Sequence, residues 1–193
     1  MNMGIIAASR LREAVGRVNL IGQDLGTRLY KYTNIALANN GKLYAAPFNL
    51  SQVLEIDPVN QTTTLIGQDL GSGSNKYQSL ALANNGKLYA PPRDASQVLE
   101  IDPVNQTTTL IGQDLGSGIN KYNTLTLANN GKLYAAPGTA SQVLEIDSVN
   151  QTTTLIGQDL GSEVYKYFSL ALANNGKLYA APFNASQVLE INP

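Results

Sequence analysis

The side chains that could carry chemistry in this sequence are carboxylates, lysines and tyrosines, because its 193 residues contain no histidine and no cysteine. The common nucleophile–base pairs and most zinc sites need one of those two residue types. The carboxylates of Asp69, Glu100 and Asp102 recur at equivalent places along the chain, except that Asn192 replaces the last aspartate. A catalytic site normally needs one asymmetric constellation, so recurring carboxylates indicate turn caps and backbone partners. We therefore predict that the protein is not an enzyme and holds no metal and no cofactor.

These residues recur because almost the whole chain consists of one repeated unit, of which residues 79–115 are an example. A marker glycine lies at positions 22, 67, 112 and 157, so the period is 45 residues. Self-similarity at a fixed period outranks every local signal in deciding the fold. The few positions at which the copies differ are therefore the most informative ones.

Four short runs within the unit are typical of strands, because each mixes β-branched, aromatic and aliphatic residues between turn formers. They cover residues 79–83, 87–90, 97–101 and 107–113. Asn85-Gly86 lies between the first two runs and predicts a tight primed hairpin turn. Residues 102–106 contain a proline beside two turn formers and predict a second, slightly longer hairpin.

A four-stranded antiparallel sheet of about 40–45 residues, repeated in tandem, is typical of a β-propeller blade. The segments SLALANNGKLYAAP and QVLEIDP, in this order, resemble blades of the NHL-like propellers. The resemblance covers all four repeats. It implies an all-β propeller of four-stranded antiparallel blades, four per chain, and implies little about function, because one fold hosts many functions.

The phase of the repeat predicts how the ring closes. Residues 17–23 match the fourth strand of a blade, whereas the last repeat begins at Ser169 and stops after its third strand. We predict that the N-terminal strand pairs beside Gln187–Ile191 and closes a monomeric ring of four blades, because an open sheet edge is an aggregation liability. The same phase permits a strand-exchanged homodimer with eight blades.

Residues 1–16 fall outside the repeat, and we predict a short helix or a disordered leader there, followed by the propeller at 17–193. With 13 basic and 14 acidic residues, the chain lacks the excess of lysine and arginine that a nucleic-acid partner requires. No apolar run approaches the ~20 residues that cross a membrane. We expect a soluble protein, and the sequence leaves its compartment undetermined.

Differences between the repeats gather in two windows. One window covers residues 27–36 and its equivalents, around a constant Lys-Tyr pair, and the other covers residues 46–50 and its equivalents. In a propeller blade these two links emerge on one face, and the nearly constant turns emerge on the other. This distribution favours a binding face varied on a constant scaffold, although demanding hairpin geometry could also keep the turns constant.

The residues in the variable windows are those expected of a binding site, because exposed aromatic rings and polar groups bind sugar faces or protein partners. We expect the aromatic residues of the first and last blades to become neighbours when the ring closes. The middle blades are expected to present polar residues. The predicted ligand-binding residues are Tyr30, Phe48, Asn75, Arg93, Asp94, Asn120, Tyr165, Phe168 and Phe183.

Three functions follow from this interpretation. The first is a lectin-like or adhesion-type module that binds a carbohydrate or protein ligand. The second is a structural or interaction scaffold produced by recent repeat amplification, with no specific small ligand. The third, a hydrolase or lactonase of the kind found in some propellers, would require a metal or a carboxylate cluster in the channel.

Overall fold

The computed structural model describes residues 18–193, and the leader predicted for residues 1–16 lies outside the described residues. Every regular element in this range is a β-strand. Blade 1 comprises β1 (Ala36–Leu37), β2 (Leu43–Ala45), β3 (Val53–Asp57) and β4 (Thr62–Ile66), and blade 2 comprises β5 (Ala81–Leu82), β6 (Leu88–Ala90), β7 (Val98–Asp102) and β8 (Thr107–Ile111). Blade 3 comprises β9 (Thr126–Leu127), β10 (Leu133–Ala135), β11 (Val143–Asp147) and β12 (Thr152–Ile156), and blade 4 comprises β13 (Ala171–Leu172), β14 (Leu178–Ala180) and β15 (Leu189–Ile191).

Each blade is an antiparallel sheet whose strands follow the order of the chain. In blade 2, Ala81 pairs with Tyr89, Tyr89 with Glu100 and Glu100 with Thr109, so one row of residues crosses the whole sheet. The other blades repeat this register. The predicted fold class, an all-β propeller with four blades, is confirmed.

The first hairpin turn differs from the predicted primed turn. The Ala83 amide donates to the Lys87 carbonyl at 2.9 Å, which leaves three residues in the loop. Only Gly86 has a positive φ, 80°, and the Asn85 side chain instead accepts the Lys87 amide. The loop is therefore a three-residue turn with a left-handed glycine, a common alternative to the two-residue primed turn. The second hairpin is the longer one predicted, since Asp102 pairs with Thr107 across four loop residues.

The hydrophobic core lies between blades. Tyr77 and Leu80 of blade 2 belong to one buried cluster with Tyr44, Val53 and Ile66 of blade 1. The equivalent residues of blades 2 and 3, and of blades 3 and 4, form two further clusters. A blade therefore completes its core only when another blade stands beside it, because the face of a single sheet cannot exclude water from its own apolar side chains.

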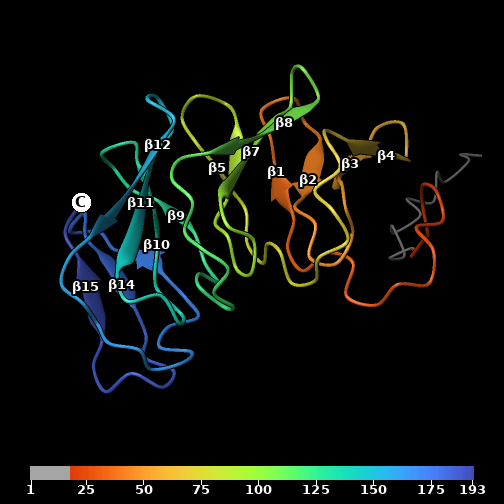
Figure 1. Ribbon diagram of the computed structural model, residues 1–193. Coiled ribbons are helices and arrows are strands. Elements are labelled where there is room, and N and C mark those ends of the chain that lie inside the picture. Colours follow the sequence, from red (N-terminus) through yellow and green to blue (C-terminus); the bar gives the residue numbers. More distant parts are fainter. Residues whose placement is uncertain (1–17) are drawn as a thin grey trace, which may run out of the picture.

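The blades follow one another around an arc, from β1–β4 at one end to β13–β15 at the other (Figure 1). The innermost strands β1, β5, β9 and β13 contact one another in this sequence, and no comparable contact joins β13 to β1. The sheet of blade 4 has three strands. The N-terminal strand predicted beside Gln187–Ile191 is not found there, and residues 18–23 form no strand in the described structure.

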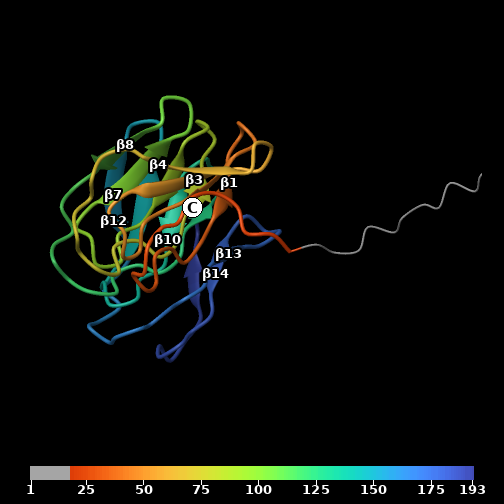
Figure 2. The ribbon, with the colours of Figure 1, turned by 90° about the vertical axis from the view of Figure 1, so that its right-hand side faces the viewer.

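The N-terminal segment lies against blade 1 instead. The Gln23 amide donates to the Thr63 hydroxyl at 3.0 Å, which places the segment beside β4. Figure 1 shows this segment, in red, at the opposite end of the arc from the C-terminus, and Figure 2 gives the perpendicular view. No helix within residues 18–193 is long and apolar enough to cross a membrane.

Candidate functional site

The two kinds of loop lie on different faces of the arc, as the sequence predicted. The variable windows are hydrogen-bonded to each other: the Arg93 amide donates to the Lys76 carbonyl, and the Lys121 amide donates to the Arg93 carbonyl, both at 2.9 Å. The constant turns are also bonded to each other, since the Asn85 side chain donates to the Ser148 carbonyl at 2.9 Å. We call the side formed by the two variable windows the variable face.

Three of the four constant lysines of the variable windows are shielded from solvent. Lys76 and Lys121 are buried, and the Lys76 ammonium donates to the carbonyls of Gly71 and Gly73 at 3.2 and 2.6 Å. Burial lowers the pKa of both lysines. These lysines therefore close their own loops. Three of the constant tyrosines, Tyr77, Tyr122 and Tyr167, pack between blades.

The recurring carboxylates have structural partners. The Asp102 carboxylate accepts the amides of Val104 and Asn105, which holds the pKa of Asp102 below its usual value. Glu100 differs from the prediction, because it binds side chains instead of capping a turn. Its carboxylate lies 2.7 Å from the Lys87 ammonium and accepts the Tyr89 hydroxyl at 2.7 Å. Burial is the largest cause that raises the pKa of Tyr89.

Arg93 is the centre of the polar part of the variable face. Its guanidinium carbon lies 5.2 Å from the centre of the Phe48 ring, and its Nη1 lies 3.6 Å from an Asp94 oxygen. Asp94 in turn accepts the Asn120 amide at 2.7 Å, which links blade 2 to blade 3. Four predicted residues are thus brought together. Asp94 is already occupied in this contact, so we assign it a positioning role.

Several polar atoms of this cluster are buried without a hydrogen-bond partner. They are Nε and Nη1 of Arg93, Oδ1 of Asn120 and both amide atoms of Asn123. The Asn123 residue is only 3% exposed. A buried polar group left unsatisfied costs about 1–3 kcal/mol, so such groups indicate a place where water or a ligand binds. They are the strongest chemical signal on the variable face.

The sequence-based list missed Asn123 and the neighbouring Gly138. A Cβ at position 138 would collide with the Asn120 carbonyl and the Asn123 side chain. The equivalent positions in the other blades carry Phe48, Arg93 and Phe183. The absence of a side chain at 138 therefore lets the two asparagines approach the backbone closely. Both residues lie inside the variable windows, and comparison of the four copies position by position would have found them.

The aromatic residues of the last blade form one cluster. The Tyr165 and Phe168 rings stack with centres 5.6 Å apart, and Phe168 meets Phe183 edge to face at 4.7 Å. The Tyr165 hydroxyl accepts the Asn120 side chain at 3.1 Å, which connects the aromatic cluster to the polar one. The expected juxtaposition with the aromatic residues of blade 1 does not form, because the arc keeps blades 1 and 4 apart and Phe48 lies beside Arg93.

The two remaining predicted residues lie toward the other end of the face. Asn75 donates its amide to the Asn49 side chain at 2.9 Å, the same link that Asn120 makes with Asp94. Tyr30 is 73% exposed and adopts a left-handed backbone, φ 52°. Predicted residues therefore follow the arc from blade 1 to blade 4, and those from Phe48 to Phe183 form a continuous series of contacts.

Two equivalent grooves lie beside this series, at blades 2 and 3. Their volumes are about 430 and 420 Å³. Asp94 lines the first groove, and Thr139, at the equivalent position, lines the second. The walls otherwise consist of repeated residues such as Tyr77 and Tyr122. The grooves therefore have one shape and differ in charge at a variable position.

Comparison with known proteins shows the fold. No protein-family model matches the chain, and no curated protein matches it. Hydrazine synthase from Kuenenia stuttgartiensis superposes with a TM-score of 0.63 at 16% identity, over 92% of this chain and 49% of that one. Virginiamycin B lyase from Staphylococcus aureus gives 0.63 at 9% identity, over 86% and 57%. The extracellular domain of a putative hybrid two-component system from B. thetaiotaomicron gives 0.62 at 18%, over 78% and 19%.

These neighbours correct one prediction. The chain was expected not to be an enzyme, but two of the superposed structures are a synthase and a lyase. The prediction is contradicted because the fold is one that carries catalysis.

Within residues 18–193, no group of three or more carboxylates lies close enough together to hold a metal ion. The chain spans about half of the two enzymes and a fifth of the extracellular domain. The chain thus has a β-propeller fold, shared with NHL-like and virginiamycin B lyase-like propellers.

Proposed function

We propose that the protein binds a carbohydrate through the variable face, at the junction of the polar cluster of blades 2 and 3 with the aromatic cluster of blade 4. One observation carries the proposal: the unpartnered buried atoms of Arg93, Asn120 and Asn123 lie on the face where the repeats differ. Although the repeats are nearly identical, these groups do not recur in all four blades. These polar atoms are already removed from water in the free protein. A ligand that bonds to them therefore gains hydrogen bonds without a further cost for desolvating these atoms.

The chemistry of these atoms favours hydroxyl groups. Asn123 offers one open donor and one open acceptor, and a sugar hydroxyl both donates and accepts. The Arg93 guanidinium adds donors, and the nearby Asp94 carboxylate offsets its charge, so the site does not demand an anion. The exposed Phe183 ring lies at the far side of the same series of contacts and supplies an apolar surface of the kind that packs against a sugar ring.

A glycan array tests the proposal. We expect the unaltered protein to bind a defined set of glycans, and Asn123→Ala to weaken this binding about tenfold or more, since one or two hydrogen bonds are lost. Phe183→Ala should weaken the same binding through loss of ring contact. Asn39→Ala is the matched control, because Asn39 is an exposed asparagine near the constant turns, where a Cβ on Gly86 would meet it.

Three results would contradict the proposal. The array could show no binding to any glycan. Asn39→Ala could reduce glycan binding as much as Asn123→Ala does. Binding to a protein ligand, lost on the same substitutions, would assign the variable face to the protein-ligand alternative.

A further inference from the structure

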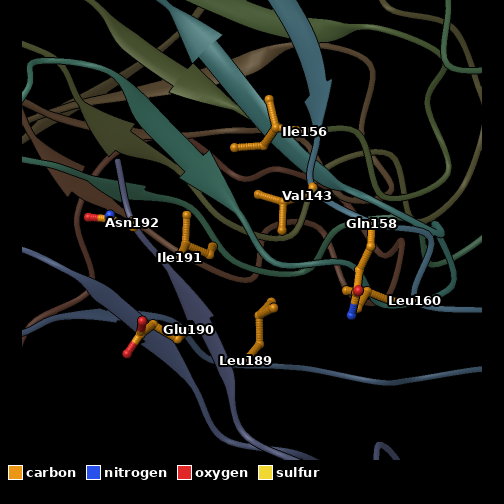
Figure 3. Close-up of a pocket in the computed structure, with 9 residues that line it drawn as sticks. Val143, Ile156, Gln158, Leu160, Leu189, Glu190, Ile191 and Asn192 are labelled. Carbon is orange, nitrogen blue, oxygen red and sulfur yellow. The ribbon is translucent and has the colours of Figure 1, made fainter.

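Blade 4 has an uncovered sheet edge with a pocket beside it. The pocket has a volume of about 450 Å³ and is lined by β15, by Val143 of β11 and by residues from the end of β12 to Leu160 (Figure 3). In blades 1 and 2 the fourth strand covers the equivalent edge. Val98 of blade 2 is completely buried, whereas Val188, at the equivalent position, is 62% exposed. The edge of blade 4 is therefore shaped to receive a fourth strand.

The opposite end of the arc carries a segment that has the sequence of a fourth strand but pairs with no sheet. Residues 20–25 read Leu-Ile-Gly-Gln-Asp-Leu, identical to residues 65–70, which close blade 1 and continue toward blade 2. Ile21 is 41% exposed, while Ile66 is 4% exposed. Leu20 and Val18 are exposed as well. Of these side chains, Ile21 matches the isoleucines that β4 and β8 bury in their own blades, Ile66 and Ile111.

The N-terminal segment is already held as if a preceding blade were present. The Gln68 amide of blade 1 donates to Thr108 of blade 2 at 3.0 Å, and the Gln23 amide makes the same bond to Thr63 at 3.0 Å. Gly22 lies so close to Thr63 that a Cβ would collide with it, as at the other blade junctions. The segment therefore lies beside blade 1 at the place that the outer strand of a preceding blade would occupy.

Blade 1 also exposes the surface that would pack against a preceding blade. Leu80, Leu125 and Leu170 are buried in the core clusters that they share with the blade before them. Ile35 stands at the equivalent position in blade 1 and is 54% exposed. Blade 1 thus lacks a preceding blade, and blade 4 lacks a fourth strand.

We propose that two copies of the 193-residue chain associate head to tail, each supplying residues 18–21 as the fourth strand of the other copy's blade 4. Two four-blade arcs then form one ring of eight blades, within the range known for propellers. Two equal head-to-tail contacts close such a ring. Closure within one chain is disfavoured because Gln23 is bound to Thr63 at the far end of the arc from β15.

The register of the new pairing follows from blade 1, where Val53 pairs with Ile66, Leu54 with Leu65 and Ile56 with Thr63. By the same register, Val188 pairs with the partner's Ile21, and Leu189 with the partner's Leu20. Ile191 pairs with the partner's Val18. The pocket in Figure 3 is then filled by the partner's Val18, which lies over Gly157 as Thr108 lies over Gly67.

The mass of the protein in solution and a cross-link test this assembly together. By light scattering we expect twice the chain mass of 20.6 kDa. Because the chain has no cysteine, Leu20→Cys with Leu189→Cys should form a disulfide that joins two chains. Leu20→Cys with Leu155→Cys is the matched control, since Leu155 is an exposed leucine that already pairs within blade 3. That control should form no disulfide.

A substitution at the uncovered edge separates assembly from folding. Val188→Asp should convert the dimer into a monomer while the far-ultraviolet circular dichroism stays unchanged, because the side chain is exposed in the single chain. Val149→Asp, in an exposed turn, should leave the dimer intact. A monomer at all concentrations, an intramolecular Leu20–Leu189 disulfide, or an assembly larger than two chains would overturn the proposal. None of these results bears on glycan binding by the variable face.

Discussion

Blade 2 and blade 4 have nearly the same sequence and opposite environments. In blade 2 the carboxylate of Glu100 is buried, and a glutamine from blade 3, Gln151, donates to it at 3.2 Å. In blade 4 the equivalent Glu190 makes the same contacts with its lysine and tyrosine, but its side chain is 47% exposed. The difference shows that a blade supplies this hydrogen-bond pattern itself, whereas the burial of its glutamate depends on the blade that follows it. The comparison predicts that equal substitutions have unequal effects.

The largest difference is expected for core leucines. Leu99→Ala in β7 removes a completely buried side chain and should lower the free energy of unfolding by about 2–5 kcal/mol. Leu189→Ala in β15 should cost clearly less, because Leu189 is only half-buried. Urea unfolding at concentrations where the chain is monomeric by mass measures both values. Equal losses of unfolding free energy in the two variants would show that another segment covers the edge of blade 4 in the single chain.

The next difference concerns the glutamates. Glu100→Gln should lower the free energy of unfolding by about 2–3 kcal/mol, because it leaves Lys87 and Tyr89 facing a neutral group in a buried site. The upper end of the usual range is not expected, since the Lys87 side chain is 28% exposed. Glu190→Gln should have little effect, because water screens its exposed pair. The same urea experiment applies, and a larger loss for Glu190→Gln would contradict the comparison.

A pH-dependent difference follows from the second hairpin. The amides of Asn105 and Val104 lower the pKa of Asp102, so the folded state favours its carboxylate. This stabilisation is complete above the ordinary aspartate pKa of 3.8 and is lost as the pH falls through the lowered folded value. In blade 4 Asn192 stands at this position and cannot titrate. Asp102→Asn should therefore flatten the loss of stability between neutral pH and about pH 2.5. Thermal unfolding at a series of pH values checks this, and an unchanged acid slope would contradict it.

The smallest effect is expected at the positive-φ positions of the variable face. Blades 2 and 3 carry Asn75 and Asn120 there, whereas blades 1 and 4 carry Tyr30 and Tyr165. Asparagine tolerates this conformation better than tyrosine does. Tyr30→Asn should raise the free energy of unfolding by about 0.5–1 kcal/mol, because the Tyr30 ring is largely exposed. Tyr165→Asn should raise the free energy of unfolding by less, since this variant also loses the stacking on Phe168. Thermal unfolding of the two variants compares them, and a loss of stability in Tyr30→Asn would contradict the prediction.

Part of the candidate site could be predicted from the repeats alone. Comparison of the four copies identified the variable windows, and nine residues within them lie on one face. The same comparison could not pair Phe48 with Arg93 or group Phe168 with Phe183, because these contacts depend on how neighbouring blades are rotated. Asn123 was overlooked because an asparagine is common in loops. Its burial without a partner is visible only in the tertiary structure.

The period, the positions of the strands in the four blades, the two hairpins and the separation of variable from constant loops follow from the sequence alone. These features are local: hydrophobic alternation, Asn-Gly and Asp-Pro turns and chain order act within one repeat of 45 residues. Three features appear only in the tertiary structure: the chain forms an open arc, residues 18–23 lie on blade 1, and Lys76, Lys121 and Lys166 are buried. Curvature is the sum of the small rotations between blades. That sum is set by packing across three interfaces, and no single repeat encodes it.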